Sequence, residues 1–269
     1  MENKNTNSCA HKSVAEWKEL VAEFQKPDVG RATWQIVNTL GPIAAIWISL
    51  YFVKSISLWL CIPLSMLAGL FLIRAFIIFH DCGHGSFFKT KRANNILGFI
   101  TGMLTFTPYH HWKWEHAVHH ATNGDLDKRG IGDIWTLTVQ EYLASSRWVK
   151  ISYRFLRNPF ILFGLAPLFL FFVLERFPSK KCKPRERRSV YIMNLALLAW
   201  CSVMSAIFGF LPFLLIQVTM MAVAGTCGIW LFYVQHQFED TYWAQGEDWD
   251  FTAAAMEGSS YYKLPRIMQ

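Results

Sequence analysis

Long apolar segments constrain this sequence more than any other feature. A helix needs roughly 20 mainly apolar residues to cross the hydrocarbon core of a bilayer. Residues 36–53 and 56–79 form two such segments, and residues 190–235 are long enough for two more, divided near Gly209. With 53% hydrophobic and only 17% charged residues, the chain lacks the composition of a soluble domain. The sequence therefore predicts an all-α integral membrane protein with about four transmembrane helices.

Two further apolar segments, residues 96–106 and 160–177, are predicted to be shallow, either interfacial or re-entrant. If the second one crossed the membrane, the basic cluster at 176–188 would lie opposite the other basic loops, against the positive-inside tendency. We therefore expect one domain over residues 1–269. Its parts are a polar N-terminal segment (1–31), a helical hairpin (36–79), a histidine-rich cap (80–158), an interfacial segment (160–177) and two spans (190–235).

The net charge of +7 is better explained by a membrane than by nucleic acid. Seven basic residues and one acidic residue crowd positions 176–188, between apolar segments. Such clusters orient membrane proteins and contact anionic lipid. The six cysteines form no CxxC pair, so they indicate neither a disulfide framework nor a zinc site. We expect the bilayer as a partner and no nucleic acid.

The nine histidines are concentrated beside the predicted spans. His80 and His84 stand four residues apart in HDCGH, directly after the second apolar segment. His116, His119 and His120 stand at positions i, i+3 and i+4 in HAVHH. Both spacings place side chains on one face of a helix. Each motif therefore directs several imidazoles toward one point.

His236 follows the last predicted span, which ends on the same side of the membrane as the second. Imidazole suits iron, copper, zinc and nickel, and this many nitrogens exceed the needs of one tetrahedral zinc. Among the nearby carboxylates, we single out Asp125 as a partner that fixes the orientation of a ligand ring. His110 and His111 remain open between ligand and hydrogen-bonding roles, and His11 is expected to bind no metal. The predicted dinuclear metal centre consists of His80, His84, His116, His119, His120 and His236.

These motifs resemble those of the membrane-bound fatty acid desaturase family. HDCGH resembles the first histidine box of the family and HAVHH the second, of the form HxxHH. Residues 116–142 and the stretch VQHQFEDTYW are similar to the bacterial acyl-lipid branch, and the resemblance runs from about residue 31 to the C-terminus.

The resemblance implies an oxidoreductase that introduces a cis double bond into a membrane acyl chain. It implies O2 as co-substrate, two non-haem iron ions held by the histidines, and a ferredoxin-like or other electron donor. It also implies a location in the bacterial cytoplasmic membrane, with the histidine boxes on the cytoplasmic face.

The sequence departs from the family pattern in one respect. Family members carry a third box, another HxxHH, after the last span, whereas no histidine follows His236 here. We therefore expect a chain that is cut short at its C-terminus, with an incomplete metal site and no activity in the 269-residue form.

Two other functions stay open on the sequence. A related di-iron hydroxylase or ketolase would share the metal ligands but would leave a hydroxyl or keto group on its substrate. A non-enzymatic, histidine-rich membrane protein would bind metal reversibly and consume no O2.

Overall fold

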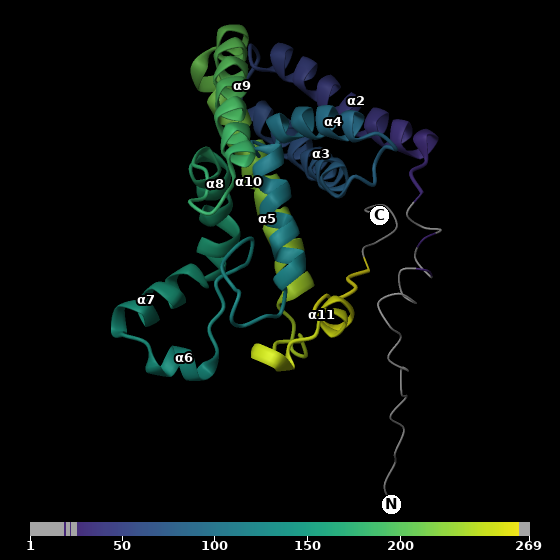
Figure 1. Cartoon of the computed structure of the whole chain (residues 1–269). Coiled ribbons are helices and arrows are strands. Elements are labelled where there is room, and N and C mark those ends of the chain that lie inside the picture. The colour runs from purple at the N-terminus through teal and green to yellow at the C-terminus, as the bar shows by residue number, and fades with distance from the viewer. Residues whose placement is uncertain (1–18, 20–21, 23–25, 264–269) are drawn as a thin grey trace, which may run out of the picture.

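The computed structural model describes residues 19, 22 and 26–263, and His11 lies outside them. Four helices are long and apolar enough to cross a membrane (Figure 1). They are α2 (Val29–Val53), α3 (Leu58–His84), α9 (Pro184–Phe208) and α10 (Phe210–His236). The described residues contain no β-strand beyond one isolated bridge between Asp125 and Ala244. The predicted all-α membrane fold with four spans is confirmed.

Two of the spanning helices, α2 and α9, begin earlier than the apolar runs that predicted them. Asp28 caps α2, since its Oδ1 accepts a hydrogen bond from the Arg31 N–H at 3.0 Å. The start of α9 at Pro184 matches the preference of proline for the first helical turn. Capping residues, rather than the edges of the apolar runs, set these boundaries.

The two tight turns between the spans lie on one side of the protein. Lys54, in the turn between α2 and α3, donates hydrogen bonds from Nζ to the carbonyl oxygens of Ile207 and Phe208 at the end of α9. The opposite ends of α3 and α10 therefore share the other side. This arrangement brings His80 and His236 to the same face, as the sequence predicted.

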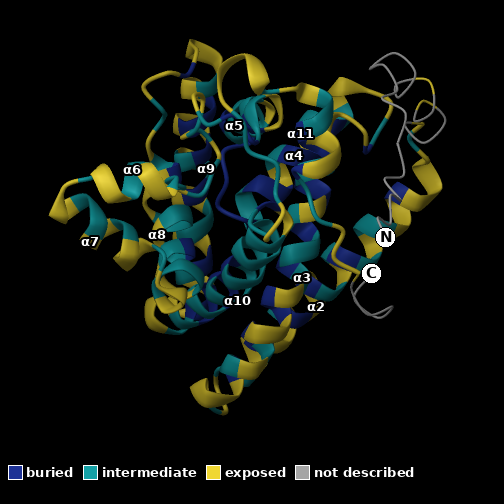
Figure 2. Ribbon diagram, turned by 90° about the horizontal axis from the view of Figure 1, so that it is seen from below, coloured by how far each residue is buried: buried dark blue, intermediate teal, exposed yellow. Residues whose placement is uncertain are grey.

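Apolar side chains fill the space between the spans and also cover much of their outer surface. Leu50, Ala68 and Ile216 are fully buried where α2, α3 and α10 meet, and Met204 of α9 joins the same cluster. Large apolar residues on the outward faces, such as Leu198, are exposed (Figure 2). An apolar exterior of this kind suits lipid contact, since a bilayer core offers no water to polar groups.

The two predicted shallow segments are short helices packed on the spans. The first contains α4 (Lys91–Leu104), which packs against α3. The second is a π-helical turn (Phe160–Leu165), α8 (Ala166–Phe172) and a 3₁₀ turn (Leu174–Arg176). It crosses α10 at Gly225, where Pro167 occupies the space that a side chain would need. Together with α7 (Arg147–Leu156) it is also apolar enough to span, but the two parts are bent by 61°.

The remaining helices form a cap at the histidine-bearing ends of α3 and α10. In this cap, α5 (Tyr109–Thr122) packs against α9, and α11 (Phe251–Glu257) contacts α5 (Figure 1). Helix α6 (Val139–Ala144) lies beside α7, away from the bundle, and a 3₁₀ turn spans Gly246–Asp248.

Candidate metal centre

The last turn of α3 carries His80 and His84. Gly85 ends this helix with a left-handed φ of 76°, and its N–H donates a hydrogen bond to the Cys82 carbonyl oxygen at 3.0 Å. A glycine adopts this conformation without steric cost, so the helix runs through HDCGH and stops directly after it. The two imidazoles consequently lie one above the other on one helical face.

Helix α5 is fixed against α3 by Tyr109, at its first residue. The Tyr109 hydroxyl donates a hydrogen bond of 2.6 Å to the carbonyl oxygen of Cys82, between the two α3 histidines. The tyrosine ring lies over Gly98 of α4, where a Cβ atom would overlap it. Fully buried and hydrogen-bonded, Tyr109 sets the position of the second histidine motif relative to the first.

Four of the six predicted ligands form one group, the histidine quartet (His80, His84, His116 and His120). The Nε2 atom of His116 lies 3.0 Å from those of His80, His84 and His120. The Nε2 atoms of His80 and His84 are 3.2 Å apart. Nitrogens bound at about 2.1 Å to one ion lie about 3 Å apart when they occupy neighbouring coordination positions. The quartet thus has the donor type and spacing of a transition-metal site.

Two imidazoles of the quartet are held in the neutral form, which is the form that binds metal. Burial, followed by the neighbouring imidazoles, lowers the pKa of His116 to about 2 and that of His120 to about 4. The Nδ1 of His80 lies 3.1 Å from the Asp81 carboxylate, which accepts a hydrogen bond from Nδ1–H and leaves Nε2 free as a ligand atom. At neutral pH His116 and His120 therefore present nitrogen lone pairs to a common centre.

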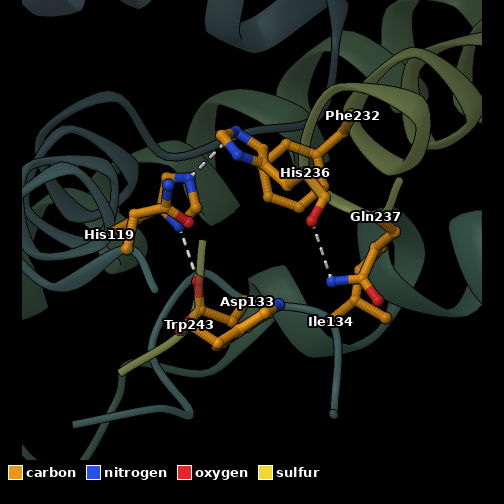
Figure 3. Close-up of a pocket in the computed structure, with 8 residues that line it drawn as sticks. His119, Asp133, Ile134, Phe232, His236, Gln237 and Trp243 are labelled. Carbon is orange, nitrogen blue, oxygen red and sulfur yellow. Dashed lines mark hydrogen bonds and ion pairs between the residues drawn. The ribbon is translucent and has the colours of Figure 1, made fainter. Parts of the chain in front are cut away.

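The other two predicted ligands form a second group, the histidine pair (His119 and His236), shown in Figure 3. His119 donates from Nδ1 to the Asp133 carboxylate at 2.6 Å, and His236 donates from Nδ1 to the Gly258 carbonyl oxygen at 3.0 Å. Both Nε2 atoms then carry lone pairs, and they face each other at 3.3 Å. Two facing lone pairs repel each other, so this geometry calls for a cation between them.

A small cavity of about 10 Å³ adjoins the histidine pair. Its lining includes Phe232, whose ring lies about 5 Å from the rings of both His119 and His236. This volume is about what a single water molecule needs. The cavity is suited to an ion or a water molecule and is too small for an acyl chain.

The carboxylates that contact the predicted ligands are not the one chosen from the sequence, Asp125. Asp125 accepts hydrogen bonds from the Lys128 Nζ at 2.8 Å and from the Asp127 N–H, and it contacts no imidazole. Asp133 and Asp81 contact His119 and His80 instead. Asp125 therefore shapes the loop after α5, while Asp133 orients a predicted ligand.

His110 and His111 lie outside both groups. The His110 N–H donates to the Ser189 hydroxyl on α9 at 3.0 Å, and its ring lies 3.4 Å from Arg185. His111 accepts a hydrogen bond from the Ser179 N–H at 3.0 Å. Both residues attach α5 to α9 and the loop before it.

Trp112 is also part of the site. Its indole stacks on the His116 ring, with centroids 4.3 Å apart and planes 16° apart, and it also contacts Phe79. Gly83 of α3 leaves the space that the indole occupies. Trp112 stands four residues before His116, so the i, i+4 spacing that grouped the histidines also predicts this contact.

Comparison with known proteins finds similar sequences over most of the chain. The family model for fatty acid desaturases matches residues 57–267. A fatty acid desaturase of Bacillus subtilis (strain 168) is 48% identical over 260 residues, which cover 97% of this chain and 74% of that protein. A Synechocystis sn-1 oleoyl-lipid 12-desaturase is 24% identical, over 94% of this chain and 71% of its own length. A Synechocystis sn-1 acyl-lipid omega-3 desaturase (ferredoxin) is 27% identical, over 87% and 66% respectively.

Proposed function

Because the chain belongs to the fatty acid desaturase family, a family of oxidoreductases, we propose that it introduces a cis double bond into a membrane acyl chain with O2 as co-substrate. One observation carries this proposal. Six imidazoles from α3, α5 and α10 converge in a quartet and a pair at the ends of membrane-spanning helices. Such a site lies where an acyl chain of the bilayer can reach it.

The proposed cofactor is two non-haem iron ions, one held by the quartet and one by the pair. The donor set fits, since every ligand is an imidazole nitrogen and the Nε2 spacings match shared coordination. Bound iron supplies O2 activation for the oxidation of unreactive C–H bonds.

The protein's own groups hold and shield this site. Asp133 and the Gly258 carbonyl oxygen fix the ring orientation and proton position of the pair, and Trp112 fixes the His116 ring by stacking. The Phe232 ring covers both members of the pair and limits the approach of water. The rigid placement of ligands by such neighbours raises their affinity for metal.

The proposed partners and orientation follow from the relatives and from the charges. Several similar desaturases are named for acyl-lipid substrates, and some of these names specify ferredoxin, which supports a membrane lipid substrate and a ferredoxin-like donor. The tight turns on the side opposite the histidines carry one basic residue, Lys54, whereas the basic cluster at 176–188 precedes α9 on the histidine side. This asymmetry supports a cytoplasmic histidine face in a bacterial membrane.

The proposal is tested by the fatty acids of a bacterial host that lacks desaturases and expresses the full-length gene. We expect a new fatty acid lacking two hydrogen atoms, which disappears in His84→Ala and His236→Ala. His110→Gln is the matched control, because His110 belongs to the same motif region but to neither ligand group. A fatty acid that gains an oxygen atom would identify a hydroxylase instead, and metal binding without any new lipid would identify a non-enzymatic protein.

A further inference from the structure

Helix α7 has one face of large apolar side chains that no part of the described chain covers. Trp148, Ile151 and Phe155 are 77%, 46% and 58% exposed. Their spacing of three and four residues places them on one side of the helix. Figure 2 shows α7 at the margin of the molecule, with much of its surface exposed. Three adjacent exposed side chains of this size usually mark a binding surface.

The side of α7 next to this apolar face is basic. Arg147, Lys150 and Arg154 are its only charged residues. Lys150 donates to the Leu143 carbonyl oxygen at 2.8 Å, and Arg154 donates to the Tyr142 hydroxyl at 2.6 Å, so both lean toward α6. These hydrogen bonds keep the basic side chains away from the apolar face. Positive charge and apolar surface thus lie on adjacent sides of the helix.

The position of α7 relates it to the end of a span. Arg157, which follows α7, donates a hydrogen bond of 2.9 Å to Gln237, the residue after α10. Phe163, in the next segment, packs on Tyr233 in the last turn of α10 with ring centroids 5.5 Å apart. The chain bends by 61° between α7 and that segment. Helix α7 therefore lies beside the histidine-bearing end of α10. It is bent away from the following segment, residues 160–176, which packs on α10.

We propose that α7 is an interfacial helix that inserts Trp148, Ile151 and Phe155 into a leaflet of anionic lipid and places Arg147, Lys150 and Arg154 among the phosphates. A basic amphipathic helix with tryptophan and phenylalanine on its apolar face has the composition for this position. The bilayer is favoured over a protein partner for two reasons. The apolar face leads directly to Phe160, which is 85% exposed, and the α7 charge complements anionic headgroups.

Spin labels on the apolar side and on the basic side of α7 test the proposal in the full chain. Phe155→Cys and Lys150→Cys place a nitroxide on the apolar and basic sides, and the labelled unsubstituted chain gives the background from native cysteines. Each protein is reconstituted in nanodiscs of phosphatidylglycerol or of phosphatidylcholine. Relaxation by O2 and by a water-soluble nickel chelate then reports the depth of each label. We expect the Phe155 label to respond to O2 and the Lys150 label to the nickel chelate.

A second part of the experiment tests the preference of α7 for anionic lipid. The Phe155 label should lie deeper in phosphatidylglycerol than in phosphatidylcholine. Replacement of Arg147 and Arg154 by Gln should remove this difference, whereas Lys180→Gln with Lys181→Gln, at positions outside α7, should preserve it. A Phe155 label that responds to the nickel chelate in both lipids would overturn the proposal, as would equal depth in the two lipids. A label that becomes shielded only when an acidic electron-transfer protein is added would assign the face to that protein.

Discussion

The Nε2 atoms of His119 and His236 lie 3.3 Å apart although 117 residues separate the two histidines in the chain. The contact forms because α10 ends on the same side as α3, where α5 is docked by the hydrogen bond from Tyr109 to Cys82. Each ring also donates a hydrogen bond from Nδ1–H, His119 to the Asp133 carboxylate and His236 to the Gly258 carbonyl oxygen. Local helix geometry thus forms the quartet, and the packing of the spans forms the pair.

Asp133→Asn should weaken metal binding at the histidine pair. An amide in place of the carboxylate no longer favours the Nδ1–H tautomer of His119, and loss of such a partner typically costs about 10- to 100-fold in metal affinity. Competition with a chelator, followed by metal analysis, measures the change. Asp125→Asn is the control, because Asp125 bonds to Lys128 and contacts no imidazole. Equal weakening in both variants would argue against the role assigned to Asp133.

Trp112→Ala should lower both stability and metal affinity at the quartet. The substitution removes the ring stacked on His116 and opens a cavity against Phe79, at a cost of about 2 kcal/mol for a partly exposed indole. Trp112→Phe should restore most of both properties, since phenylalanine also stacks. Thermal unfolding and chelator competition measure the two effects. Unchanged metal affinity in Trp112→Ala would show that stacking does not position His116.

Gly98→Ala should destabilise the cap by about 1–3 kcal/mol, the usual cost of an overpacked contact. The added methyl group would overlap the Tyr109 ring and displace the tyrosine from Cys82. Gly228→Ala is the matched helical control, because no atom lies within 4 Å of the position that its added methyl group would take. Thermal unfolding in detergent should separate the two variants, and equal stabilities would contradict the packing described for Tyr109.

The ion pair between Glu141 and Arg129 should make stability depend on acidity. The Arg129 guanidinium, followed by the Thr138 N–H, lowers the pKa of Glu141 from 4.5 to about 2. Because folding lowers this pKa, the charge of Glu141 stabilises the folded state at pH values above its ordinary pKa. This contribution is lost as the pH falls toward about 2. Glu141→Gln keeps a capping side chain on α6 but removes the charge.

The measurement is the difference in unfolding temperature between the metal-free protein and its Glu141→Gln variant. We expect the difference to be largest near neutral pH and to decline between about pH 4.5 and pH 2. A difference that stays constant across this range would show that the charge of Glu141 contributes nothing.

Apolar length and helical spacing were enough to predict the spans and the histidine motifs. Residues 56–79 and 190–235 are long apolar signals, and the i, i+4 relation of His80 to His84 depends only on helix geometry. The pairing of His119 with His236 required the side of the membrane on which α10 ends. The charge distribution supplied that information before the structure did.

The carboxylate partner could not be chosen from the sequence, because the loop after α5 has no periodic pattern. Gly124 and Gly132 adopt left-handed φ values of 74° and 72°, and these two turns decide which acidic residue faces the site. Gly132 lies so close to His119 that a Cβ atom would be 3.1 Å from the histidine Cβ. This approach brings Asp133, rather than Asp125, to the imidazole. The shortened C-terminus and the inactivity of the 269-residue form, which were expected from the family resemblance, stay predictions.

The central claim is that six histidines form two adjacent iron sites, and metal analysis of the purified protein tests it most directly. We predict about two iron ions per full-length chain, with about one lost in His236→Ala and the quartet ion retained, as the imidazole donor sets require. Zinc in place of iron, or an iron content that His236→Ala leaves unchanged, would contradict the account.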